Sequence, residues 1–335
     1  MKLKFFLPLL LILIAFSCGR KNRFSIDSDY KRVEVKIQRF DSDLIQLDTT
    51  DLSVSVEQLY ARYPRFLPTF ISDLDTISSQ DTLAVARVLK DFITYPKVMQ
   101  INQKVLETFS DVSAMEKDIS EAYTYISYYF PKLKLPEVYF YVSGLSRPVM
   151  MDEGMNFIGI GSDFYLGSDY ELYQSAVYDY QLQNMRPESI STDVVSAVLF
   201  NYFRFDSKQN RLIDNMLHRG KVMYLLSVFM PEQTKQDIMG YTDVQWSWAV
   251  NNESKIWKQM ISQKDLFSSD LPLIRSYLNE APFTSRISPE SPGRLGTWVG
   301  MRIVENYMKK NKDVTLQRLM QLNDYQKLLQ ESGYK

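Results

Sequence analysis

The only cysteine of this 335-residue chain, Cys18, directly follows a basic start and an apolar run, and its position constrains the chain more than any other feature. Two lysines lie among the first four residues, residues 5–16 are apolar, and small side chains precede Cys18. This is the layout of a secretory signal. The apolar run is shorter than the roughly 20 residues that cross a bilayer, which argues against a transmembrane anchor.

The segment resembles a bacterial lipoprotein signal. The resemblance implies removal of residues 1–17 and attachment of a diacylglyceryl group to the thiol of Cys18, which becomes the N-terminus. Stable anchoring requires at least two chains, such as diacylglyceryl plus palmitate. Residues 18–30 would then be a lipidated tether, basic and polar at its start. A cleaved secretory signal with an incidental cysteine and an uncleaved anchor are the alternatives.

The composition limits the chemistry of the remaining chain. With Cys18 acylated, no thiol is left for a disulfide, a thiolate metal site or a nucleophile, so stability must come from packing. The full chain has 22 tyrosine, 19 phenylalanine and 15 methionine residues, most of them in the remaining chain, which provide material for that packing. Removal of two lysines with residues 1–17 changes the net charge from −1 to −3, which gives no footprint for nucleic acid, and only 12 glycines argue against a dinucleotide-binding loop. The single histidine, His218, excludes a two-histidine zinc motif.

Residue periodicity predicts an α+β fold, predominantly helical with a small β-sheet, in which residues 31–335 form a single large domain. Residues 32–40 alternate polar and apolar side chains, which favours a strand, as do residues 136–143 and 157–161. The stretch 53–130 favours helices that are broken before each proline. Helices dominate again from residue 191. The breaks are expected at Pro64, Pro68 and Pro96.

Two helical segments carry candidate functional side chains. Asp214 lies four residues before His218, which favours a half-exposed histidine paired with a carboxylate over a catalytic base. Trp246, Trp248 and Trp257 crowd a second segment. Aromatic rings with a polar edge suit both cores and binding grooves, so these tryptophans are either core residues or a partner or sugar groove.

Residues 290–308 are the most constrained-looking run of the chain. Ser291 can cap a helix whose first residue is Pro292. Gly296 and Gly300 then share one helix face, where each glycine costs about 1 kcal/mol against alanine. We expect another backbone to approach this face closely. Arg294 is a candidate for surface or interfacial pairing.

Several segments together resemble one family, the gliding motility lipoprotein GldB of Bacteroidota. They are the lipoprotein start and residues 128–136, 163–167, 220–224 and 290–300, of which residues 291–296 are the most specific. The resemblance implies a cell-envelope lipoprotein that is needed for gliding and associates with proteins of the type IX secretion and motility apparatus. Basic rather than acidic residues after Cys18 favour a periplasm-facing position, on the inner membrane or the inner leaflet of the outer membrane.

GldB-like proteins are also similar in layout to zincin-type peptidases, in which a cleft-edge strand precedes a helix carrying His-Glu-x-x-His and a later acidic ligand. The corresponding helix, residues 192–204, has neither histidine nor glutamate, and Arg219 stands where an acidic residue is expected. Zinc needs imidazole or carboxylate ligands. We therefore expect a zincin-like scaffold without metal or cofactor.

Three classes of function remain. The first and favoured one is a non-enzymatic, lipid-anchored component of the gliding and secretion machinery. The second is a glycan- or peptide-binding envelope lipoprotein that contacts the cell wall through the tryptophan segment. The third is a hydrolase that uses carboxylates such as Asp152, Glu153 and Asp163, although these residues are more typical of turn and strand caps.

Overall fold

The computed structural model describes residues 23–75 and 77–335, and residues 31–335 form one compact unit. Residues 23–30 belong to a separate short unit, in which the Arg23 guanidinium lies 4.7 Å from the centre of the Phe24 ring. The predicted signal and the predicted lipidation site, Cys18, lie outside the described residues. Within the described ranges, no helix combines the length and apolar character needed to cross a membrane.

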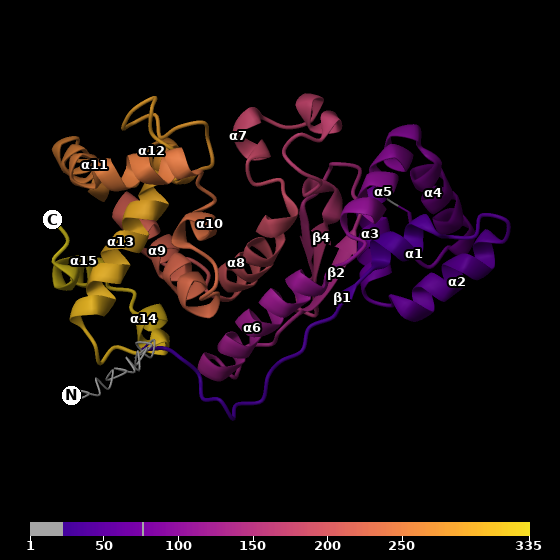
Figure 1. The fold of residues 1–335 in the computed structure, drawn as a ribbon, viewed down its shortest axis with the longest axis horizontal. Helices are drawn as coiled ribbons and strands as arrows, with labels where there is room; N and C mark the ends of the chain where they lie inside the picture. The colour runs from indigo at the N-terminus through magenta and orange to yellow at the C-terminus, as the bar shows by residue number, and fades with distance from the viewer. Residues whose placement is uncertain (1–22, 76) are drawn as a thin grey trace, which may run out of the picture. The chain divides into compact units, whose positions relative to one another are not determined.

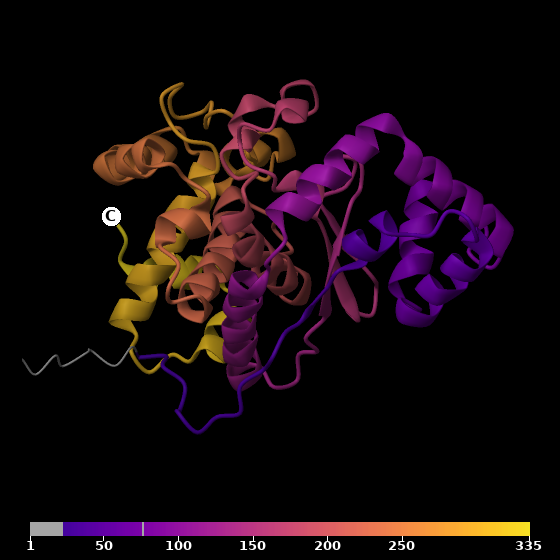
Figure 2. The ribbon, with the colours of Figure 1, turned by 45° about the vertical axis from the view of Figure 1, so that its right-hand side comes forward.

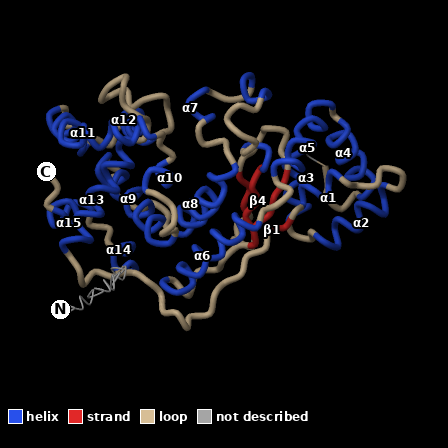
Figure 3. The backbone as a smooth tube through the Cα atoms, in the orientation of Figure 1, coloured by secondary structure: helices blue, strands red, loops and turns tan. Residues whose placement is uncertain are grey.

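Helices make up most of the large unit, as Figure 3 shows. The α-helices are α1 (Phe40–Ile45), α2 (Leu52–Arg62), α3 (Phe66–Leu74), α4 (Thr82–Thr94), α5 (Pro96–Thr108), α6 (Ser113–Tyr129), α7 (Asp179–Leu182), α8 (Ile190–Tyr202), α9 (Leu212–Phe229), α10 (Lys235–Met239), α11 (Asp243–Ser262), α12 (Leu271–Leu278), α13 (Leu295–Lys310), α14 (Leu316–Gln321) and α15 (Tyr325–Ser332). The 3₁₀ turns are Ser162–Phe164, Glu171–Ser175, Pro187–Ser189 and Asp265–Phe267. The strands are β1 (Ile37–Gln38), β2 (Glu137–Tyr141), β3 (Val149–Met151) and β4 (Phe157–Gly161).

The four strands form one mixed sheet in the order β1-β2-β4-β3. β1, β2 and β4 are parallel, with Val138 opposite Ile158, and β3 pairs antiparallel at the edge, with Val149 opposite Ile160. Figure 1 shows α1–α4 on one side of the sheet and α6 and α8 on the other, and Figure 2 shows the same arrangement from a second angle. Helices on both faces explain why β4 is buried at every residue. The predicted α+β fold with a small sheet is confirmed.

An aromatic cluster joins the sheet to the first helices. The Phe66 ring of α3 stacks on Tyr139 of β2, with ring centres 4.7 Å apart and an angle of 1° between the planes. A Cβ atom at Gly159, directly opposite Tyr139 in the register, would lie 2.7 Å from the Phe66 ring. The glycine therefore leaves the space that this stacking fills, and Phe40 of α1 packs edge-on against the same phenylalanine.

The predicted strand at residues 32–40 is mostly wrong, because only Ile37–Gln38 pair with the sheet. The extended residues before them lie along α6 instead. The backbone amides of Val33, Val35 and Ile37 donate to α6 side-chain oxygens at distances of 2.9–3.0 Å. These acceptors recur every four residues on one face of the helix: Thr124, Ser120 and Glu116. The alternation of polar and apolar residues in this segment therefore results from burial against a helix face, although it resembles the pattern of a strand.

The predicted helix breaks hold at two of three prolines. α2 ends at Arg62, before Pro64, and α5 begins at Pro96. Pro68 lies inside the first turn of α3, so the break expected there is wrong. The first amides of a helix have no intrahelical acceptor, and a proline in that turn removes no hydrogen bond.

The close backbone approach predicted for the glycine-containing helix is confirmed. α9 and α13 cross with their backbones in contact: a Cβ atom at Gly300 would lie 1.9 Å from the Met216 carbonyl oxygen, and one at Gly220 would lie 2.2 Å from the Gly300 carbonyl carbon. A Cβ atom at Gly296 would lie 3.1 Å from the Tyr277 carbonyl oxygen of α12. Each glycine therefore forms part of a helix–helix contact.

This contact predicts the effect of a single methyl group. Gly300→Ala places a carbon against the α9 backbone, which cannot move aside as a flexible side chain would, so we expect a loss of roughly 3 kcal/mol in the free energy of unfolding. Urea unfolding of the purified protein measures it. Lys309→Ala, at an exposed position of the same helix, should change stability by less than about 0.5 kcal/mol. Equal effects of the two substitutions would contradict the assignment.

Candidate functional site

Two adjoining cavities, of about 450 Å³ and about 210 Å³, form a cleft between α8, α9, α10 and the loop that precedes α13. Both are lined by Asp193, Glu280 and Arg294, and the larger also by Arg219. We call this region the charged cleft and define it by these four side chains. Two arginines and two carboxylates thus surround the larger cavity, and Asp237 also lines the smaller one.

Asp193 lies in the first turn of α8, where the side chain accepts a hydrogen bond from the Tyr165 hydroxyl at 2.9 Å. Burial raises the pKa of the Asp193 carboxyl to about 6, and the nearby Glu280 carboxylate acts in the same direction. The Tyr165 hydrogen bond and the Arg294 guanidinium oppose this increase. Asp193 is therefore a carboxylate at neutral pH and titrates in mild acid.

Arg294 immediately precedes α13 with a φ of 59°, a left-handed conformation that is uncommon for side chains other than glycine, asparagine and aspartate. Its guanidinium donates to Glu280 at 3.1 Å and to the Met239 carbonyl oxygen at 3.5 Å. The helix start predicted at Ser291 and Pro292 is wrong, since both lie in the preceding loop. Left-handed backbone of this kind persists only where the surrounding structure imposes it, and it concentrates at functional sites.

Arg219 lies on α9 and is partly buried. Burial lowers the pKa of its guanidinium, and the neighbouring Arg294 lowers it further, whereas Glu280 raises it. Within the part of the chain that the structure describes, Arg219 makes neither a hydrogen bond nor an ion pair. A guanidinium that is partly withdrawn from water, faces a second arginine and lines a cavity is well placed to receive an anion.

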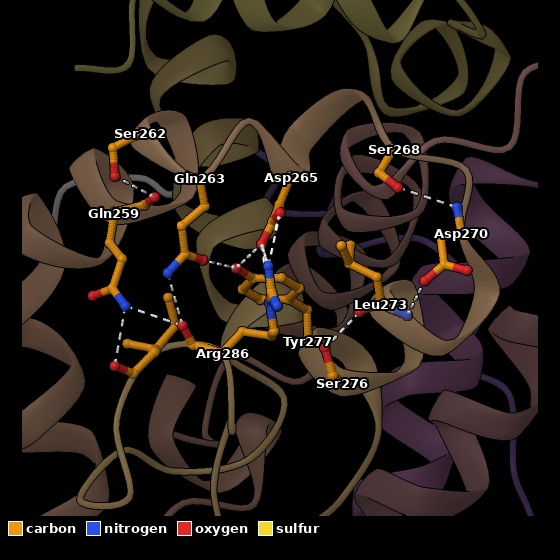
Figure 4. Close-up of polar contacts among 11 residues, drawn as sticks. Gln259, Ser262, Gln263, Asp265, Ser268, Asp270, Leu273, Ser276, Tyr277 and Arg286 are labelled. Atoms are coloured by element: carbon orange, nitrogen blue, oxygen red, sulfur yellow. Dashed lines mark hydrogen bonds and ion pairs between the residues drawn. The ribbon is translucent and has the colours of Figure 1, made fainter.

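The loop that carries Glu280 and Arg294 is fixed at its middle by a buried carboxylate (Figure 4). Asp265 accepts two hydrogen bonds from the Arg286 guanidinium terminus, at 2.9 and 3.1 Å, and one from the Tyr277 hydroxyl at 2.8 Å. Gln259 of α11 donates to the Arg286 carbonyl oxygen at 3.0 Å. These contacts tie the loop to α11 and α12, so the cleft wall rests on a rigid support.

The loop is also closed on itself. The Thr284 hydroxyl donates to the Pro292 carbonyl oxygen at 2.8 Å, and the Thr284 amide donates to the Ser291 hydroxyl at 3.0 Å. The Tyr241 hydroxyl donates to the Gly293 carbonyl oxygen at 2.6 Å, directly before Arg294. Ser291, predicted as a helix cap, instead closes this loop.

The residues predicted to take part in interactions lie in different parts of the structure. Arg294 lines the charged cleft, whereas Gly296 and Gly300 serve helix packing. Trp257 is 5% exposed and packs edge-on against Tyr334, with ring centres 5.2 Å apart. The Trp246 ring meets Trp298 at 6.4 Å. None of the three α11 tryptophans, Trp248 included, lines the charged cleft.

The predicted pairing of His218 with Asp214 is wrong. Asp214 binds the Arg211 guanidinium at 2.9 Å and the Ser207 hydroxyl at 2.9 Å, at the start of α9. His218 is buried, with its ring edge-on to Phe205. Helical spacing places the two side chains on one face, but the turn preceding α9 supplies closer partners for the carboxylate.

Two of the three carboxylates considered for a hydrolase, Asp152 and Asp163, act in turns. Asp163, which is fully buried, accepts from the amides of Ser143 (3.1 Å) and Leu145 (2.7 Å), and burial raises its pKa to about 6. Asp152 accepts from the Asn156 amide at 2.6 Å. The interpretation of both as turn and strand caps is confirmed.

The sequence marks Arg219 and the α8 segment only by the zinc ligands that they lack. No pattern in the sequence marks Tyr165, Asp193 or Glu280 as a site residue. Glu280 follows α12 in a stretch without a local motif, so no sequence signal connects it to the cleft. Among the described residues, no three His, Cys, Asp or Glu side chains come together in a way that could hold a metal ion.

Comparison with known protein families matches residues 21–335 to gliding motility protein GldB. The chain belongs to the GldB family. This membership makes it a gliding-motility-associated lipoprotein by family, as the sequence resemblance predicted. Comparisons with curated proteins and with solved structures give no match.

The burial of His218 predicts acid sensitivity of this GldB-family protein. Burial, with Lys221 and Arg219 nearby, lowers the pKa of His218 to about 4 from an ordinary value of 6.5. The folded protein therefore favours the neutral imidazole, and the contribution of His218 to the free energy of unfolding is fully present above pH 6.5. As the pH falls toward 4, about 2–3 kcal/mol of this free energy is lost. We expect urea unfolding across this range to show a smaller acid-induced loss in His218→Gln. An equal loss in both proteins would exclude His218 as the source.

The Tyr165 hydrogen bond predicts the titration of Asp193. Tyr165→Phe removes a donor to the carboxylate, so the pKa of Asp193 should increase above 6, by about one unit. Carboxyl chemical shifts of the ¹³C-labelled protein measure it. Tyr170→Phe is the matched control, because its buried hydroxyl has no hydrogen-bond partner in the described structure. A Tyr165→Phe titration that superimposes on wild type would refute the role of this hydroxyl.

Proposed function

We propose that this protein is a lipid-anchored component of the gliding and type IX secretion apparatus that acts by binding rather than by catalysis. The match of the GldB family over residues 21–335 carries the proposal. The charged cleft supports it, because a rigid, charged hollow can hold a partner or ligand within an assembly.

The anchor would be the acylated Cys18, with residues 19–23 near anionic headgroups. The sequence after Cys18, Gly19-Arg20-Lys21, favours a periplasm-facing position, on the inner membrane or the inner leaflet of the outer membrane. A body of about 300 residues on a short tether would remain close to the membrane surface. Proteins of the motility machinery are its proposed partners.

The cleft side of α8 supports a non-catalytic role. Thr192, Asp193 and Ser196 line the larger cavity, in the helix where a zincin would carry its histidines and glutamate. Hydroxyls and one carboxylate are a poor ligand set for zinc. We therefore propose a zincin-like scaffold without the metal site, and one tightly held zinc ion per chain in purified protein would overturn this part.

A hydrolase is the second candidate, and one observation favours it. The Asp193 pKa of about 6 lies in the range where a carboxyl can exchange protons with a substrate. A carboxylate with a single tyrosine partner does not by itself provide a nucleophile and an acid. Incubation of the purified protein with a peptide would decide between the two: release of free amino acids that is lost in Asp193→Asn would establish a hydrolase, and no release is expected if the protein only binds.

Lipidation predicts the behaviour of one variant. Cys18→Ala should lose labelled palmitate, remain uncleaved by the lipoprotein peptidase and fail to restore gliding to the deletion strain. Ser17→Ala, which changes the neighbouring residue and keeps the thiol, is the control and should be labelled as in wild type. Labelling, membrane fractionation and spreading of colonies are the measurements. Equal labelling of Cys18→Ala would refute the anchor.

A further inference from the structure

We infer that the charged cleft binds a short zwitterionic peptide, with its carboxylate on the two arginines and its ammonium group toward the two carboxylates. The inference deepens the proposed function and rests on it in one respect, that the cleft is a binding site. It names the chemical class of the ligand.

Arg219 gives the position of the anionic group. It is partly buried, lines the larger cavity and has no hydrogen bond or ion pair among the described residues. Arg294 lines the same cavity, and the two guanidinium groups repel each other. Glu280 is bonded to Arg294 at 3.1 Å and has no hydrogen bond to Arg219 in the described structure. A carboxylate from a ligand would supply the missing acceptor and relieve the repulsion.

The two carboxylates restrict the kind of anion. Asp193 and Glu280 line the same cavity, so the four charged groups sum to zero. A phosphate dianion would gain from the arginines but would be repelled by both carboxylates at short range. A ligand that carries one negative and one positive group meets a complementary group at each end. This charge balance selects a zwitterion over a polyanion.

The size of the larger cavity favours a short chain over a single amino acid. The cavity of about 450 Å³ is several times the volume of one amino acid, and the four charged side chains that would bind the two termini all line it. Thr192, Ser196 and Asn279 line the same cavity, and their hydroxyl and amide groups can pair with peptide N–H and C=O groups.

The Tyr165 hydroxyl prepares the cationic end of the site. It donates to Asp193 at 2.9 Å and so favours the charged form of that carboxyl. The acid that would face the ligand's ammonium group is thus ionised at neutral pH and loses its charge in mild acid. Glu280 and Arg294 are the other charged groups that act on it, with opposite signs.

Calorimetry of the purified full-length protein with four probes tests the inference. The probes are trialanine, N-acetyl-trialanine, trialanine amide and inorganic phosphate. We expect trialanine to bind most tightly at pH 7.5, blocking of either end to weaken binding tenfold or more, and binding to weaken at pH 5. No binding of trialanine at millimolar concentration would overturn the inference. Equal binding of phosphate or of the acetylated peptide would also overturn it, leaving a simple anion site.

Variants locate the site. Arg219→Gln should weaken trialanine binding tenfold or more, and Arg219→Lys, which keeps the charge but not the planar fork, should weaken it less. Arg204→Gln is the control, because Arg204 is exposed just after α8 and, among the described residues, bonds only to Asn201. Unchanged binding by Arg219→Gln, in a protein whose unfolding matches wild type, would overturn the location.

The same samples separate this inference from the proposed function. Free alanine is measured after each titration. Cleavage of trialanine would overturn the non-catalytic function and leave the ligand class standing. Absent binding would overturn the ligand class alone, because lipidation and gliding are measured independently.

Discussion

The contact between the backbones of α9 and α13 is the constraint on which the cleft depends. Gly220 and Gly300 allow the two helices to cross with no side chain between them. Arg219 directly precedes the first glycine, and Arg294 directly precedes α13. The crossing therefore brings two arginines from distant parts of the sequence to one cavity, and a methyl group at either glycine would force the helices apart.

The loop before α13 completes the cleft through a second rigid contact. Asp265 and Arg286 hold its middle, while Tyr241 holds the carbonyl group of Gly293. Both ends of the loop, Glu280 and Arg294, then meet in one ion pair. Because a buried carboxylate with three donors is costly to disrupt, the charges of the cleft are held in place before any ligand arrives.

Local sequence patterns predicted the elements whose environment is simple. β2 and β4 are central strands with apolar runs, and α5 starts at Pro96. Gly300 contacts the backbone of another helix, which the energetic cost of a glycine inside a helix had implied. The wrong predictions share one cause. In each, a segment or side chain contacts a different partner in the folded protein from the one that its local sequence pattern suggests. Residues 32–36 alternate because they lie against α6, and Asp214 prefers the turn before its helix to His218.

The sequence by itself determined the family and the helical α+β class, and it predicted a lipid anchor. All three depend on contiguous motifs and on periodicity along the chain. Only the tertiary structure decided the site. Asp193, Arg219, Glu280 and Arg294 come from α8, α9 and the two ends of one loop, and no spacing along the chain relates them. Their meeting depends on helix crossing and loop closure, which act over distances in space that a linear pattern does not record.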